Sequence, residues 1–80
     1  MAIIYYVVVP FDRNEAGALM AGAAREATTA ATAEMGARAL AVGRAGAVAF
    51  SRTGDPATGE FEDAVVLAHF GEVDLDALSE

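Results

Sequence analysis

The chain has 80 residues, no cysteine and one histidine, and its 12 acidic and 5 basic side chains give a net charge of −7. This length predicts one domain, residues 1–80, with a thin core, because a domain of this size buries only about 60 % of its unfolded surface. The lack of cysteine excludes disulfides and a thiolate zinc site. A hydrophobic fraction of 55 % is too high for a disordered chain.

Charge is divided unevenly along the sequence. Residues 1–52 hold all five arginines and four acids, whereas residues 53–80 hold eight acids and no base. This balance argues against nucleic acid or an anionic membrane surface as a partner, because both attract cationic side chains. The acidic part favours solubility; the alternative is that it meets a basic protein surface or the arginines of a second copy.

The most apolar stretch is residues 2–10, which is too short to cross a bilayer and rich in β-branched and aromatic side chains. We predict a strand over 3–9 that is buried on both faces and ends at Pro10. No basic stretch precedes it and no small-residue cleavage site follows it. A signal peptide is therefore not expected, and the predicted location is cytoplasmic.

Residues 11–28 allow two interpretations. One is an irregular arm with a short extended piece near 23–26, and the other is the first half of a long alanine-rich helix. We favour the arm, because Gly17 and Gly22 would cost such a helix roughly 2 kcal/mol relative to alanine.

A helix is predicted over 30–42. Thr28 and Thr29 are good N-caps, because a threonine hydroxyl accepts a bond from a free N–H of the first turn, and Gly43 is a typical stop. The arc expected to face a sheet comprises Thr32, Met35, Gly36, Ala39, Leu40 and Gly43, and the opposite arc comprises Glu34, Ala37, Arg38 and Ala41.

Two further strands are predicted, over 46–52 and 61–70. The segment between them is dense in turn-forming residues, so the two strands should form an antiparallel hairpin with a long loop. The tail, residues 72–80, is either a single helical turn capped by Asp74 or a disordered end.

These elements predict an α+β fold with the order strand, arm, helix, strand, strand, short tail. The sheet would have three mostly antiparallel strands, with the one helix on one face. The other face would still carry large apolar side chains, which a second copy can cover. We therefore expect a homodimer, with its sheets packed face to face or joined edge to edge.

Four polar or aromatic residues are candidates for a ligand or interface site. Arg52 ends a predicted strand and can clamp a carboxylate or phosphate. The simpler interpretation is that nearby Asp55 pairs with it or serves the turn. His69 has a side chain suited to general base chemistry near neutral pH, although a half-exposed strand histidine is the simpler interpretation. Tyr5 has a hydroxyl able to line a pocket or interface, and packing is the simpler role.

No motif for catalysis, metal or cofactor binding is present, so no catalytic residue, metal or cofactor is predicted. Residues 46–61, GAVAFSRTGDPATGEF, with 68–71, AHFG, resemble the end of a group of short bacterial proteins, a resemblance that implies no activity. The first strand resembles the opening strand of small ferredoxin-like dimeric α+β barrel enzymes. That family has the order βαββαβ, whereas the elements predicted here end after a third strand.

Two functions follow from these expectations. The first is a small non-enzymatic protein that associates with itself and with other proteins. The alternative is a small dimeric enzyme or ligand-binding protein of the α+β barrel type, with Tyr5, Arg52 or His69 lining a cavity between subunits.

Overall fold

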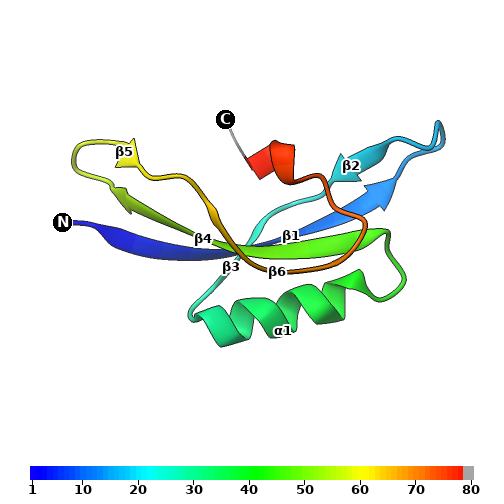
Figure 1. Cartoon of the computed structure of the whole chain (residues 1–80), viewed down its shortest axis with the longest axis horizontal. Helices are drawn as coiled ribbons and strands as arrows, with labels where there is room; N and C mark the ends of the chain where they lie inside the picture. The colour runs from blue at the N-terminus through cyan, green and yellow to red at the C-terminus, as the bar shows by residue number, and fades with distance from the viewer. Residues whose placement is uncertain (79–80) are drawn as a thin grey trace.

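The computed structural model describes residues 1–78 and shows an α+β fold, in which one helix packs against a curled, antiparallel sheet (Figure 1). In chain order the elements are β1 (Ile3–Arg13), β2 (Leu19–Ala21), β3 (Arg25–Ala27), α1 (Ala30–Ala41), β4 (Gly46–Asp55), β5 (Glu60–Phe61), β6 (Val65–Gly71) and the 3₁₀ helix η1 (Leu75–Leu78).

The described sheet has six strands, so the prediction of three is wrong. β1 and β4 form its antiparallel centre, paired from Ile3–Gly54 to Phe11–Gly46. β2 and β3 pair with the outer edge of β1, and β5 and β6 pair with the outer edge of β4. The outermost strand on each edge of the sheet is interrupted once. Residues 22–24 separate β2 from β3 on one edge, and residues 62–64 separate β5 from β6 on the other. The predicted strand over 61–70 is thus two pieces on one edge.

β1 continues through Pro10 to Arg13, whereas the sequence predicts that it ends at the proline. The carbonyl of Pro10 accepts a hydrogen bond from the amide of Gly22 at 2.8 Å, on the β2–β3 side. In an antiparallel strand the nitrogen and oxygen of one residue point to the same side. The missing N–H of Pro10 therefore faces the interruption at residues 22–24, where the neighbouring strand is broken.

The segment predicted as an irregular arm, residues 11–28, is extended and contains no helix. It holds the end of β1, a turn, β2 and β3, which makes the long-helix alternative wrong. Asn14 builds the turn: its side-chain oxygen accepts from the amides of Ala16 and Ala18, each at 2.9 Å. Strands of three residues are too short to show an alternating pattern in sequence.

α1 begins where the sequence predicts. Thr29 is its N-cap, with the hydroxyl accepting from the amide of Thr32 at 3.1 Å. The predicted buried arc is correct for Gly36 and Leu40, which face Val8 and the helix-face core, and wrong for Met35, which is 71 % exposed. Ala33 and Ala37 are fully buried instead, and their small side chains let the helix lie close to the sheet.

The sheet divides the core into two clusters. On the helix face, α1 covers Val8, Ala47 and Ala49, and Tyr6 and Phe70 pack at the margin. On the other side, which we call the open face, Val9, Phe11, Val48 and Phe50 form a second cluster.

The C-terminal tail covers part of the open face. Val73 packs against the second cluster, and the chain then enters η1 on the side of β2 (Figure 1). The helical-turn alternative is therefore correct for 75–78, and the amide of Asp76 donates to the Asp74 side chain at 3.1 Å. Arg13 ties the tail down by a two-pronged ion pair with Glu72, Nη2 to Oε2 at 2.6 Å and Nε to Oε1 at 3.3 Å.

The Arg13–Glu72 pair makes tail docking dependent on pH. The hydrogen bond from Arg13, and then its charge, lower the pKa of Glu72 below its ordinary value. The stabilisation is therefore complete above the ordinary glutamate pKa and is lost as pH falls through the lowered value. We expect the NMR signal of the Arg13 Nε–H to shift across that range, and to stay unchanged in Glu72→Gln. An identical titration of the Gln variant would contradict this.

Candidate functional site

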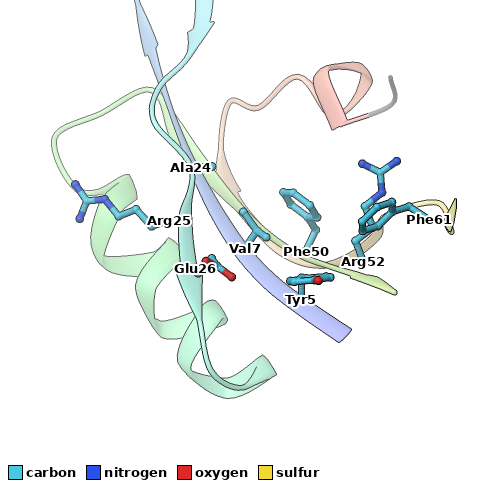
Figure 2. A pocket seen from close by; sticks show the side chains of 8 residues that line it. All are labelled: Tyr5, Val7, Ala24, Arg25, Glu26, Phe50, Arg52 and Phe61. Atoms are coloured by element: carbon cyan, nitrogen blue, oxygen red, sulfur yellow. The ribbon is translucent and has the colours of Figure 1, made fainter. Parts of the chain in front are cut away.

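The open face is hollowed beside the first half of β1, beyond the area that the tail covers. The hollow has a volume of about 470 Å³ and its lining is mainly apolar (Figure 2). It is lined by Tyr5, Val7, Ala24, Arg25, Glu26, Phe50, Arg52 and Phe61.

Strand register places these side chains together. Val7 lies opposite Phe50 and Tyr5 lies opposite Arg52 across the β1–β4 pair. On the outer side of β1, Glu26 of β3 lies opposite Val7. Because paired residues in a sheet project to the same face, all five point to the open face.

Phe61 forms one wall of the hollow, and a glycine makes room for it. Its ring lies 6.1 Å from the ring of Tyr5, centroid to centroid. Gly54, its partner in the β4–β5 pair, has no side chain, and a Cβ built there would overlap the Phe61 ring. The aromatic pair of Tyr5 and Phe61 therefore depends on the glycine at position 54.

Arg52 lies on the same side as Phe61. Its guanidinium carbon is 5.7 Å from the ring centroid of Phe61, a cation–π contact. Its Nε donates to the carbonyl of Glu62 at 3.0 Å, which leaves the terminal nitrogens for other partners. The expected alternative, a pair with Asp55, is not among the ion pairs of residues 1–78.

Glu26 lies on the opposite side of the hollow. Figure 2 shows its carboxylate turned toward the hollow, while the neighbouring Arg25 extends away from it. The difference follows from the alternation of side chains along β3. Among the charged lining residues whose side chains turn toward the hollow, Arg52 therefore lies on one rim and Glu26 on the other.

Asp55 lies outside the hollow and organises the β4–β5 turn. Its side chain accepts from the amide of Ala57 at 2.9 Å, and its carbonyl accepts from the amide of Gly59 at 2.7 Å. The N-terminal ammonium lies 3.2 Å from its carboxylate. These contacts give Asp55 a structural role in the turn.

His69 is exposed on β6, opposite Val48. It is not among the residues that line the hollow. Of the four candidates, the fold therefore brings together Tyr5 and Arg52 and leaves out Asp55 and His69. Sequence reasoning missed Glu26 and Phe61 as lining residues, because their places depend on the pairing of two very short strands.

Among residues 1–78, no group of three or more histidine, aspartate or glutamate side chains is arranged to hold a metal ion. That part of the chain also contains no helix long and apolar enough to cross a membrane. No protein-family model, curated protein or solved structure matches the chain.

Proposed function

We propose that this protein is a self-associating interaction module, and that a second copy covers its open face. The observation that carries the proposal is the hollow itself. α1 covers one face of the sheet, whereas the opposite face presents a concave apolar surface next to the tail.

Exposed apolar side chains border the hollow. On the open face, Ile3 is 43 % exposed, Phe61 49 % and Val66 39 %. Isolated exposed apolar residues are common, but a contiguous patch with aromatic side chains is typical of an interface. Burying these side chains removes apolar surface from water, the main favourable contribution to association.

The surface area supports the same conclusion. The chain exposes 5099 Å², whereas a folded monomer of 8.2 kDa is expected to expose roughly 4,500 Å². The excess is on the order of 600 Å² per copy. Two copies that cover this excess would bury about 1,200 Å², which is the lower end of the range for specific interfaces.

Light scattering coupled to size exclusion, at several protein concentrations, tests the proposal. We expect a dimer that dissociates on dilution. Phe61→Glu should shift the equilibrium to monomer, because it removes the aromatic ring from the apolar contact and places a carboxylate there. Since Phe61 is half exposed, the variant should retain its fold, which circular dichroism checks.

The matched control is Met35→Glu, at an exposed position on the outer side of α1. It adds the same charge to a surface that the proposal leaves free. The molar mass that light scattering gives for this variant should therefore show the same dimer as the wild type. A wild-type monomer at high micromolar concentration would refute self-association.

A second candidate function is the binding of a small molecule in the hollow. Its volume lies within the range of about 300–1,000 Å³ that is typical of ligand pockets. The Tyr5 hydroxyl and the Arg52 guanidinium are polar groups beside apolar walls, an arrangement suited to an apolar molecule with an anionic group. Such a ligand would bind the monomer, so the scattering experiment separates the two candidates.

A further inference from the structure

We propose that two copies meet at the open face about a two-fold axis parallel to β1 and β4, so that Glu26 of each copy pairs with Arg52 of the other. This arrangement rests on the proposed self-association and specifies its geometry. It follows from the positions of two opposite charges on opposite rims of the hollow.

The two rims carry one open-face charge each. Glu26 is on β3, at the outer edge of β1, and projects to the open face opposite Val7. Arg52 is on β4, and its guanidinium extends over Phe61 of the outer strand β5. Two strands, β1 and β4, therefore separate β3 from β5, with the apolar hollow between the two charges (Figure 2).

Two other charged strand residues lie near these rims. Arg25 is also among the residues that line the hollow, but it alternates with Glu26 along β3 and its side chain extends away from the hollow (Figure 2). Glu60 alternates with Phe61 along β5. Within residues 1–78, the ion pairs involve neither Glu26 nor Arg52. Both charges are thus available to a partner at this face.

A two-fold axis in the plane of the interface has two simple orientations. If it runs along the strands, it places the β3 rim of one copy over the β5 rim of the other, and each Glu26 meets an Arg52. If it runs across the strands, it places each rim over its own equivalent, and like charges face one another. Like-charge contacts at an interface are costly, so the charges favour the first orientation.

Distances along the strands are compatible with this pairing. Glu26 is in register with Val7, and Arg52 is in register with Tyr5, two residues along β1. Two residues of a strand span roughly 7 Å. The flexible side chains of arginine and glutamate are long enough to bridge such an offset across a face-to-face contact.

The experiment uses two full-length variants, Glu26→Arg and Arg52→Glu, with dimer dissociation constants measured by sedimentation. The first has only arginine at the two rim positions, and the second has only glutamate. Each alone should weaken dimerisation by roughly tenfold or more, because two pairs per dimer become repulsive. An equimolar mixture should form a heterodimer about as tight as the wild-type dimer, because every arginine then faces a glutamate.

The outcomes separate the geometry from the proposed function. The arrangement is supported if each variant alone dimerises weakly while the mixture of the two forms a tight heterodimer. If both variants dimerise like the wild type while Phe61→Glu does not, the open face is shared but the proposed axis is wrong. A mixture that stays as weak as the single variants also overturns the axis. A monomeric wild type refutes self-association itself.

Discussion

Phe11→Ala is expected to lower the free energy of unfolding by about 3–5 kcal/mol, the usual cost of removing a buried phenylalanine ring. Phe11 is 1 % exposed and is one of the two largest fully buried side chains in the described core. It packs with Val48 under the tail, where a rigid sheet limits collapse around the cavity. A domain of 80 residues has a total stability of only about 4–12 kcal/mol, so this loss is a large share of the total stability.

Chemical denaturation followed by circular dichroism measures this effect, and Phe61→Ala is the matched control. Phe61 is half exposed, so its truncation should cost about 1 kcal/mol, roughly half of the value of full burial. Both variants are compared with the wild type at one protein concentration, because association itself adds to the apparent stability. Equal losses in the two variants would show that the core does not lie under the tail.

Gly46→Ala is expected to destabilise the protein by about 1–3 kcal/mol or more, because the added methyl group has no space. A Cβ at position 46 would lie well inside 3.0 Å of the carbonyl of Phe70 and of backbone atoms of Glu72. Backbone atoms cannot rotate away as a side chain does. The substitution must therefore push β6 away from β4 at the point where the tail begins.

Gly36→Ala is the matched control, and its effect should have the opposite sign. Gly36 lies within α1, and a Cβ there would meet only a methyl group of Val8 at 3.5 Å, an ordinary contact. Alanine is favoured over glycine in a helix by up to about 1 kcal/mol. Thermal unfolding should thus show a raised midpoint for Gly36→Ala and a lowered one for Gly46→Ala. Equal shifts would contradict the close approach at Gly46.

The sequence predicted the long elements, anticipated β3 and η1 as alternatives, and missed β2 and the separate strand β5. The strand at Ile3, the helix after Thr29 and the strand at Gly46 each have many residues of one propensity, and the helix has a clear N-cap. The two-residue and three-residue strands are stabilised by pairing with β1 and β4, which is a tertiary effect. The buried arc of α1 was correct at Leu40 and wrong at Met35, because alanines permit the closest approach to the sheet.

The candidate site was predicted in part for the same reason. Tyr5 and Arg52 lie on long strands, and their register across β1 and β4 brings them together. Glu26 and Phe61 reach the hollow only because short strands return to the sheet edges. Asp55 was correctly suspected of serving the turn, since aspartate followed by proline is a common turn start.

The interruptions at residues 22–24 and 62–64 have a consequence for how copies can associate. A continuous outer strand exposes a row of free N–H and C=O groups, which recruits further strands and leads to open-ended fibres. Here the β2–β3 edge offers no such uninterrupted row, because its two strands have three residues each, whereas β6 on the other edge has seven. Growth by strand addition is therefore suppressed at the β2–β3 edge. In the proposed dimer, contact through the open face would close after one partner and give a finite assembly.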